Sequence, residues 1–367
     1  MKIAILGSRG VPNRYGGFEE MAAQVAGHWS ASHDVTIYTV SDHPEKCEEY
    51  NGAKVVHIYN PENNLGLAGQ FIYDLFCILH VRRQKPDVIL QLGYTTSAIW
   101  SFLWPKKIPT VVNMDGIEHK RAKYKGPLAS FLRWSEKRAI KGATALVADN
   151  EGIASYLQGK AKGTPISTIT YGATVPAEIG IEWAQQLFTE HGRSTKPGSY
   201  LLHVGRIQPD NHIKEFLAAA ATSGIPTVAI GDYTTLYGQK LKADFSRFPN
   251  ILFAGTVYCK NTLNALRAHC LYYIHGHSAG GTNPALLEAM ACQAYVLAHD
   301  NTFNRSTLGG HGEFWSNTGD LAKLLASPVD KEGHKKTTEE ALKKIQEHHQ
   351  WSSIASQYLD LFASILR

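Results

Sequence analysis

Short apolar, β-branched runs alternate with longer amphipathic segments along the whole chain. In the first half the runs lie at residues 2–6, 34–40, 54–59, 87–92, 110–114, 145–148 and 166–170, and helical patterns separate several of them, as at 18–29 and 70–83. Continuous apolar strands that alternate with helices are typical of parallel sheets built from βαβ units. The sequence therefore predicts an α/β fold with doubly wound parallel sheets.

The polar stretch GRSTKPGS at residues 192–199 divides this pattern into two halves. Gly, Pro and Ser in such a run are typical of a linker. After it the apolar runs resume at 200–204, 227–230, 251–253, 271–274 and 295–298, and an amphipathic helix is expected at 351–366. A chain of 367 residues has room for two cores. We therefore expect two α/β domains.

Cysteine usage and the first residues indicate a cytoplasmic protein. The five cysteines are widely spaced and form no CxxC, which is the pattern of reduced thiols and not of disulfides or a zinc site. The chain enters a strand at once, without a long apolar leader, so no signal peptide is expected. Polar residues interrupt the uncharged stretch at 89–105, so it does not resemble a membrane span. The net charge of +5 fits an anionic ligand or surface.

Ligands of doubly wound domains bind at the carboxyl ends of the strands. After the first expected strand, the loop GSRG at 7–10 continues to Arg14, Tyr15, Gly16 and Gly17 before a helix. Glycines allow close backbone approach, and a helix N-terminus favours an anion. The spacing matches neither GxGxxG nor GxxxxGK(S/T), which counts against a nicotinamide site and a P-loop. A tight turn before a helix is the alternative to a ligand site.

In the second half, Gly205, Arg206 and Asn211 follow the first expected strand. The guanidinium of Arg206 can fork onto phosphate oxygens, and Asn211 can donate one more hydrogen bond. A surface arginine in an ordinary loop is the alternative.

The strongest motif is HGHSAGGTNPALLEAMA at residues 275–291. A strand should end before it, and Pro284 suits the first turn of a helix. Glu288 would accept hydrogen bonds from ribose hydroxyls, and a solvated helix acid is the alternative. Satisfied strand-end residues are the alternative for His275 and His277, because no metal-binding spacing is present. Backbone amides of the loop can bind a diphosphate, namely those of Gly281, Thr282 and Asn283.

Two carboxylates follow the expected strand at 110–114. Asp115 and Glu118 would lie at a strand end, where a carboxylate can act as a base or orient a hydroxyl. A loop aspartate that caps the next helix is the alternative for Asp115.

The segment 120–141 carries eight basic residues against one acid, Glu136, with aromatic and aliphatic residues between them. This composition suits an anionic membrane or a lipid-linked phosphate. A solvated helix face is the equal alternative. Nucleic acid is not expected as a partner, because no binding motif accompanies the charge.

Together these motifs resemble the retaining glycosyltransferase family 4, and within it the bacterial branch that contains rhamnosyltransferases of surface polysaccharide synthesis. The resemblance covers nearly the whole chain. It rests on RYGGFE at 14–19, VNMDGIEHKRAKY at 112–124, GRIQPDN at 205–211, the motif at 275–291 and the closing helix. It implies a GT-B fold, in which two Rossmann-like domains face a cleft. An acceptor domain would span 1–192, a nucleotide-sugar donor domain 199–350, and a helix at 351–367 would cross back to the first domain.

The resemblance also implies roles for single residues. Gly16 and Gly17 would place amides near the donor phosphates, Arg206 would neutralise the diphosphate, and Glu288 would hold the ribose as the second acid of an E-x7-E motif. The remaining donor-binding residues would be Asn211, His277, Gly281, Thr282 and Asn283, and the acceptor-binding residues would be Arg14, Tyr15 and Glu118.

Three positions depart from the family pattern. Gly280 stands where the first acid of E-x7-E belongs, Asn211 where a basic residue is usual, and Asp115 where a histidine is usual. Two alternatives to a transferase stay open. One is a sugar-nucleotide epimerase of GT-B fold, and the other is a non-catalytic nucleotide-sugar-binding protein.

The expected reaction is transfer of a hexose or deoxyhexose, rhamnose among the candidates, from a dTDP- or UDP-linked donor to a glycan or lipid-linked acceptor, with retention. The leaving phosphate would take the proton of the incoming hydroxyl, and Arg206 would stabilise its charge. Asp115 would orient a reacting hydroxyl, and closure of the cleft would exclude water. No cofactor or metal is expected. Segment 120–141 would contact the inner face of the cytoplasmic membrane peripherally.

Overall fold

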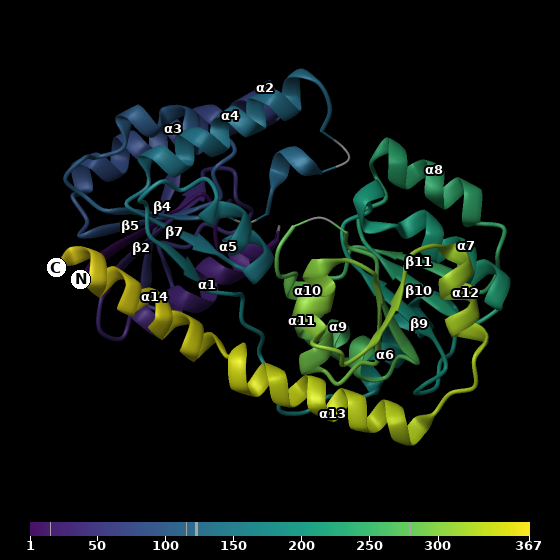
Figure 1. Ribbon diagram of the computed structural model, residues 1–367. Coiled ribbons are helices and arrows are strands. Elements are labelled where there is room, and N and C mark those ends of the chain that lie inside the picture. Colours follow the sequence, from purple (N-terminus) through teal and green to yellow (C-terminus); the bar gives the residue numbers. More distant parts are fainter. Residues whose placement is uncertain (15, 115, 122–123, 279) are drawn as a thin grey trace. The chain divides into compact units, whose positions relative to one another are not determined.

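The computed structural model describes every residue except 15, 115, 122–123 and 279 (Figure 1). The chain forms two compact units. Unit 1 comprises residues 1–171 and 351–367, and unit 2 comprises residues 172–350. Each unit is built around one sheet.

Unit 1 contains an eight-stranded sheet in the order β3-β4-β2-β1-β5-β6-β7-β8. Neighbouring strands are parallel except for β3 and β4, which are antiparallel. The central strands are buried along their whole length, which explains their continuous apolar sequence. The strands are β1 (Lys2–Leu6), β2 (Asp34–Val40), β3 (Glu49–Tyr50), β4 (Ala53–Ile58), β5 (Val88–Leu92), β6 (Thr110–Asn113), β7 (Ala145–Ala148) and β8 (Ile166–Thr168).

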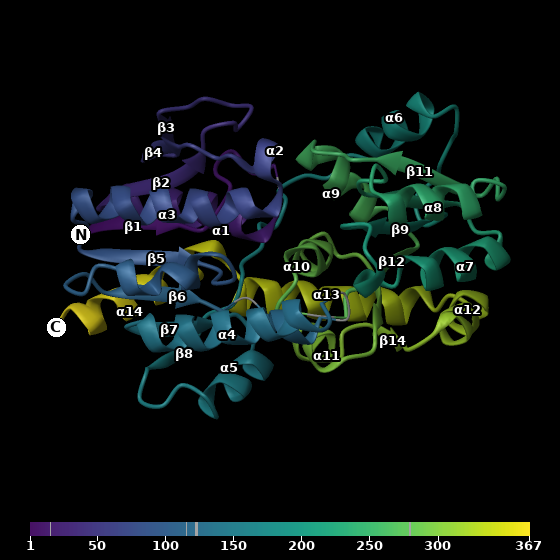
Figure 2. The same cartoon turned by 90° about the horizontal axis from the view of Figure 1, so that it is seen from above.

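The helices of unit 1 form two layers on the sheet. They are α1 (Gly17–Trp29), α2 (Glu62–Leu65), α3 (Leu67–Gln84), α4 (Pro127–Gly142), α5 (Glu151–Gln158) and α14 (Trp351–Leu366), with short 3₁₀ segments η1 (Ser97–Leu103) and η2 (Glu118–Lys120). Helices α3 and α4 lie on one face of the sheet, and α1 and α14 lie on the other (Figure 1 and Figure 2).

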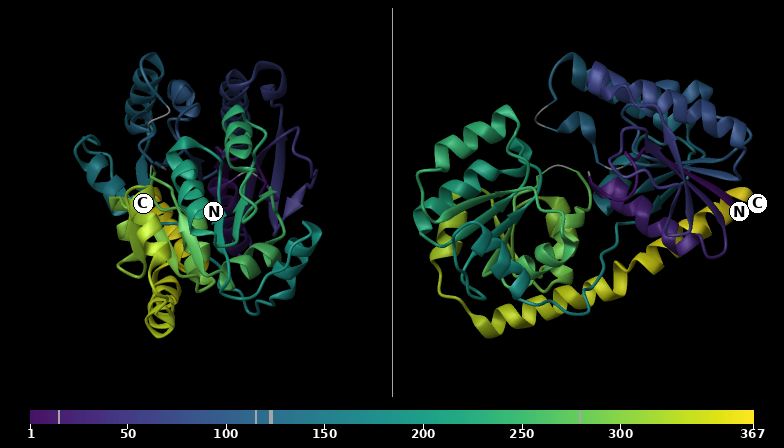
Figure 3. Two further views of the ribbon diagram at one scale, coloured as in Figure 1. Left: turned by 90° about the vertical axis from the view of Figure 1, so that its right-hand side faces the viewer. Right: turned by 180° about the vertical axis from the view of Figure 1, so that it is seen from behind.

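Helix α14 belongs to the core of unit 1 although it is the last element of the chain. It packs along α1 (Figure 3). The indole Nε1 of Trp29 donates to the carbonyl of Ala355 at 3.0 Å, and its ring lies 6.1 Å from that of Tyr358 and 5.5 Å from that of Phe362. Asn113, at the end of β6, donates through Nδ2 to the hydroxyl of Tyr358 at 2.9 Å.

Unit 2 contains a six-stranded sheet in the order β11-β10-β9-β12-β13-β14, and all neighbouring strands are parallel. The strands are β9 (Leu201–Val204), β10 (Thr227–Ile230), β11 (Ile251–Gly255), β12 (Tyr272–His275), β13 (Val296–His299) and β14 (Glu313–Trp315). The helices are α6 (Glu182–Glu190), α7 (Ile213–Ser223), α8 (Leu236–Phe245), α9 (Lys260–Ala268), α10 (Pro284–Ala291), α11 (Thr302–Leu308), α12 (Thr318–Ala326) and α13 (Lys331–His348), with a 3₁₀ segment η3 (Pro209–Asn211).

The boundary between the units falls after residue 171, whereas the sequence predicts a first domain that runs to residue 192. The difference is α6, which packs against α9 of unit 2. The ring of Phe188 in α6 lies 5.1 Å from that of Tyr200, and Arg193 donates to the carbonyl of Ile251 at 2.9 Å. These contacts assign the segment to unit 2.

No helix in the described part of the chain is long and apolar enough to cross a membrane.

Candidate functional site

The loops that carry most of the predicted donor residues follow two neighbouring strands of unit 2. Arg206 comes after β9, and the loop 276–283 comes after β12. Asn211 links them: its Nδ2 donates to the carbonyl of Arg206 at 2.6 Å, and Nδ1 of His277 donates to its Oδ1 at 2.8 Å. A Cβ at Gly276 would lie 2.0 Å from the Asn211 carbonyl oxygen, so the approach requires glycine. Asn211 therefore holds the two loops together.

Further hydrogen bonds fix the start of the loop 276–283. Ser278 donates its amide and its hydroxyl to the carbonyl of Asp210, at 3.0 and 2.8 Å. The carbonyl of His277 accepts from two side-chain amides, those of Asn301 at 3.1 Å and Asn304 at 2.8 Å. The loop is held from both sides before it reaches the helix.

The loop ends at the N-terminus of α10. Asn283 caps the helix by accepting the amide of Ala285 at 2.9 Å, and Pro284 is the first helical residue. Gly281 and Thr282 are buried, and Asn283 is partly exposed. Arg206 is exposed, and within the described residues its guanidinium has no ion-pair or hydrogen-bond partner. Such a guanidinium and a capped helix N-terminus are both suited to an anionic ligand.

Glu288, the predicted ribose ligand, forms an ion pair with Arg267 of α9. The Arg267 side chain is only 3% exposed, whereas that of Glu288 is 39% exposed. Arg267 also lies near Asn264, its Nη1 donating to Oδ1 at 3.5 Å. Sequence reasoning missed Arg267, because an arginine in an ordinary amphipathic helix gives no signal of burial.

Three histidines meet at the carboxyl ends of β9, β12 and β13. His203, His275 and His299 come from three strands that are adjacent in the sheet. Burial lowers the pKa of His203 to about 4 and, with the neighbouring histidines, holds that of His275 well below its usual range. Burial also lowers the pKa of His299 to about 4, and its ring stacks on that of His212 at 3.9 Å. All three are neutral at pH 7.

In unit 1, acidic side chains bind the glycine-containing loop that follows β1, at residues 7–16. The amide of Arg9 donates to the buried Glu19 of α1 at 2.8 Å, and the guanidinium of Arg9 pairs with Glu62 at 2.7 Å. Arg14 pairs with Glu45 at 2.6 Å.

The helix entry behind this loop is also fixed. The amide of Gly16 donates to the side-chain oxygen of Asn13 at 3.2 Å, and α1 begins at Gly17. Tyr15, a predicted acceptor ligand, lies outside the described residues.

Asp115, the predicted catalytic carboxylate after β6, lies outside the described residues as well. Glu118 is described, and its carboxylate pairs with Arg121 at 2.9 Å. Its amide donates to the hydroxyl of Tyr94 at 3.4 Å. Glu118 is the first residue of η2, which follows β6 in the chain. The guanidinium of Arg121 compensates the charge of its carboxylate.

The buried carboxylate of Glu136 contacts His119 of η2. Glu136 of α4 accepts from the Tyr156 hydroxyl at 2.9 and 3.1 Å and from Lys160 at 2.7 Å, and it lies 3.3 Å from Nδ1 of His119. The Glu136 side chain is 1% exposed. Burial alone would lower the pKa of Lys160, but its contacts with Glu136 and Tyr156 raise it. Sequence reasoning counted Glu136 as part of a basic segment and gave it no role.

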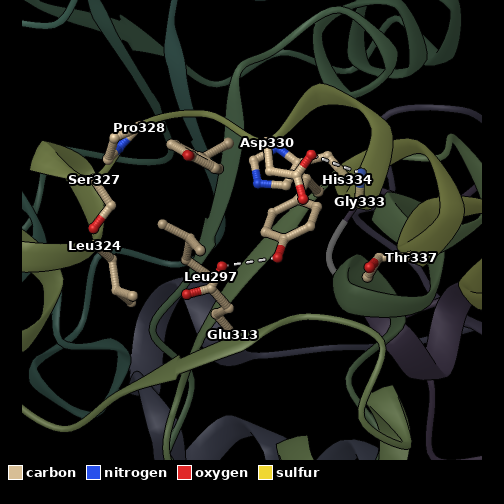
Figure 4. Close-up of a pocket in the computed structure, with 11 residues that line it drawn as sticks. Leu297, Glu313, Leu324, Ser327, Pro328, Asp330, Gly333, His334 and Thr337 are labelled. Atoms are coloured by element: carbon tan, nitrogen blue, oxygen red, sulfur yellow. Dashed lines mark hydrogen bonds between the residues drawn. The ribbon is translucent and has the colours of Figure 1, made fainter.

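A pocket of about 270 Å³ lies at the opposite, amino-terminal edge of the unit 2 sheet (Figure 4). Its polar groups pair with one another: the Tyr295 hydroxyl donates to Glu313 at 2.8 Å, and Asp330 accepts the amide of Gly333 at 3.0 Å. His334 stacks on Tyr295 at 3.6 Å. These contacts stabilise the start of α13, and we assign the pocket no ligand.

No group of His, Cys, Asp and Glu side chains among the described residues has the arrangement of a metal site.

Residues 1–174 match the model of a domain of unknown function, DUF1972. No curated protein matches the chain. Solved structures do resemble it. Sucrose-phosphate synthase from Thermosynechococcus elongatus has a TM-score of 0.78 at 16% identity, covering 99% of this chain and 98% of its own. HepE from Anabaena, in complex with UDP-glucose, has a TM-score of 0.74 at 15% identity, covering 99% of both chains.

A glycosyltransferase from Rickettsia africae is similar as well, with a TM-score of 0.71 at 15% identity, covering 100% of this chain and 98% of its own. At such identities the likeness establishes the fold. The prediction of a GT-B fold with two Rossmann-like parallel-sheet domains is confirmed.

Proposed function

We propose that the chain is a glycosyltransferase that moves a sugar from a nucleotide diphosphate donor to an acceptor. The observation that carries this proposal is the pair of loops after β9 and β12, which Asn211 ties together and which present an exposed Arg206. A guanidinium at that position can stabilise the charge that develops on a departing diphosphate. Proteins of the same fold, such as HepE, have been crystallised with UDP-glucose, which supports this class of donor.

The finer proposal is a retaining transferase that uses a UDP- or dTDP-linked hexose or deoxyhexose, with rhamnose as one candidate. Arg206, Gly16 and Gly17 would act on the diphosphate, together with the amides of Gly281, Thr282 and Asn283. Glu288 would contact the ribose through the carboxylate oxygen that does not pair with Arg267, because its side chain is partly exposed. Asp115 would orient the reacting hydroxyl. The acceptor would be a glycan or a lipid-linked saccharide of surface polysaccharide synthesis in the cytoplasm.

The first experiment is a thermal-shift panel of UDP, dTDP and their sugars with the whole protein. A ligand at 100 times its dissociation constant stabilises the folded state by about 2.7 kcal/mol, so the preferred donor should give the largest rise in Tm. Arg206→Ala should abolish most of that rise and lower the transfer rate by about 100-fold or more. The exposed Arg247 of the same unit offers a matched control, and Arg247→Ala should change neither value. An unaltered donor response in Arg206→Ala would contradict the proposal.

The competing candidate is a non-catalytic nucleotide-sugar-binding protein. Two features favour it. The side-chain amide of Asn211 is hydrogen-bonded to Arg206 and His277, and glycine stands at position 280 where the family pattern has an acid. Incubation of the preferred donor with and without candidate acceptors separates the possibilities. Transfer to an acceptor, with the anomeric configuration read by NMR, supports the transferase. Conversion of the donor without an acceptor indicates an epimerase, and binding without turnover indicates the non-catalytic protein.

A further inference from the structure

Large apolar side chains are exposed in the helical layer formed by α3, η1 and α4. Phe76 and Leu79 of α3 are each 39% exposed, Phe102 of η1 is 62% exposed, and Leu128 and Trp134 of α4 are each 47% exposed. We call these five residues, with the cations described below, the outer helical face. Exposed apolar groups concentrated in one layer are unusual for a surface that meets only water.

Aromatic contacts join the three elements into one surface. The ring of Phe71 in α3 lies 5.8 Å from that of Phe131 in α4, which in turn lies 5.9 Å from Trp134. Trp100 of η1 donates through Nε1 to the carbonyl of Phe71 at 2.8 Å, and its ring lies 6.3 Å from that of Phe102. These contacts hold α3, η1 and α4 together, so the three elements carry their exposed side chains on one connected layer.

The charge of this layer has one sign. Helices α3 and α4 together contain two acids, Asp74 and Glu136, and both are buried. Thr96 donates to Asp74 at 2.6 Å, and Lys160 pairs with Glu136. The exposed charges are therefore cations: Arg82 and Arg83 on α3, Lys106 and Lys107 after η1, and Arg133, Lys137 and Lys141 on α4.

We propose that the outer helical face docks on an anionic lipid membrane. Exposed aromatic and aliphatic side chains on the same layer as arginines and lysines match the two requirements of interfacial binding, which are apolar insertion and attraction to acidic headgroups. The surface is wider than the segment 120–141 expected from the sequence, because α3 and η1 supply three of its five exposed apolar residues. The proposal is independent of the reaction that the site performs.

The positive charge of the outer helical face favours a membrane over a second copy of the chain as its partner. Two copies of the outer helical face placed against each other would oppose cations to cations, which weakens association. An anionic bilayer supplies the missing negative charge over the whole face.

The test is sedimentation of the full chain with vesicles. Vesicles of phosphatidylcholine with about one third phosphatidylglycerol should bind the protein, and pure phosphatidylcholine should bind it at least about tenfold more weakly, because several cations face the lipid. Raising the salt concentration should weaken binding, since surface attraction is screened within a Debye length. Light scattering of the protein alone, at the same concentrations, reports self-association.

Two pairs of substitutions separate the contributions. The double variant Arg133→Glu with Lys137→Glu should lower binding to the anionic vesicles by about tenfold or more. The double variant Phe102→Ala with Trp134→Ala should also lower it, and should do so even at high salt, because apolar insertion is not screened. A matched control exists on α8 of unit 2, where Leu236 and Lys240 are exposed. Leu236→Ala with Lys240→Glu should bind as the unaltered protein does.

Circular dichroism of each variant reports whether it is folded, and these exposed positions should tolerate the changes. Four outcomes would overturn the proposal. The first is that the protein does not bind the anionic vesicles, and the second is that it binds neutral vesicles as strongly. The third is that the α8 control variant loses as much vesicle binding as the outer-face variants do. The fourth is a stable dimer whose formation the outer-face substitutions abolish.

Discussion

The buried guanidinium of Arg267 pairs with the partly exposed carboxylate of Glu288. The two side chains come from neighbouring helices, α9 and α10. Glu288 thus has a structural partner in addition to the ribose contact proposed for it. Its removal should affect stability as well as donor binding, and the two effects can be measured separately.

Glu288→Ala should lower the free energy of unfolding by about 3 kcal/mol, the low end for a broken buried pair, because Glu288 itself is partly exposed. Glu288→Gln should cost less, since the amide oxygen can still accept from Arg267. Urea denaturation measures both. Glu339 serves as the control, because its Oε1 lies 3.9 Å from Nζ of Lys335 on the surface of α13. Glu339→Ala should lower the free energy of unfolding by less than about 0.5 kcal/mol. Similar losses at both glutamates would contradict the assignment.

His203 should make unit 2 sensitive to acid. Its pKa is lowered to about 4 by burial, whereas an unfolded histidine titrates near 6.5. The unfolded chain therefore binds the proton first, and the free energy of unfolding should fall as the pH drops from about 6.5 to about 4, by about 1.4 kcal/mol per pH unit for this one group. His203→Gln should reduce that slope. His28→Gln, at an exposed position, is the control and should leave the pH dependence of the free energy of unfolding unchanged. The same pH dependence in His203→Gln as in the unaltered protein would contradict the prediction.

Asp74 should have the opposite effect in unit 1. Burial raises its pKa to about 7, although the hydrogen bond from Thr96 lowers it in part. Above pH 7 the fold must hold a buried charge, so Asp74→Asn should stabilise the protein at pH 8, on the order of 2–4 kcal/mol. The gain should shrink as the pH falls below about 7 and vanish toward 4, because the folded carboxyl is already neutral in this range and the unfolded carboxyl, with an ordinary pKa of 3.8, binds its proton only near pH 4. Unfolding at both pH values checks this, with the exposed Asp244→Asn as control.

Helix α14 should be required for the stability of unit 1. Phe362 is fully buried against Trp29, so Phe362→Ala should cost about 3–5 kcal/mol. Tyr358→Phe removes the hydroxyl that accepts from Asn113 and donates to the sulfur of Met21, and should cost about 1–2 kcal/mol. Leu366→Ala, at the exposed end of the same helix, should cost little. Chemical denaturation followed by tryptophan fluorescence gives all three values, and a small effect of Phe362→Ala would argue against this packing.

Much of the fold could be predicted because buried parallel strands leave a strong pattern. The twelve expected runs all coincide with strands of the two sheets, within two residues at most ends. The missed strands, β3 and β14, have two and three residues, too few to show a pattern. The assignment of α6 to unit 2 was not predictable either, because this helix comes directly before the linker-like stretch at 192–199 and could belong to either unit, and only its contacts with α9 decide.

For the candidate site, sequence position predicted which residues follow the strand ends but not what they contact. Arg206 and the loop 276–283 lie where the doubly wound rule places ligands. The link through Asn211, the burial of Arg267 and the Glu136 network all join residues far apart in the chain. Such long-range pairing leaves no trace in local spacing, so it emerged only from the structure.

The place of α14 in unit 1 has a consequence for how the protein is made. Residues 1–171 leave the ribosome long before the helix that covers α1 and Trp29, and all of unit 2 is synthesised in between. Domains generally fold as units during synthesis. The second unit can therefore complete its core first, while the first must wait, with an apolar surface uncovered, until translation reaches the last helix.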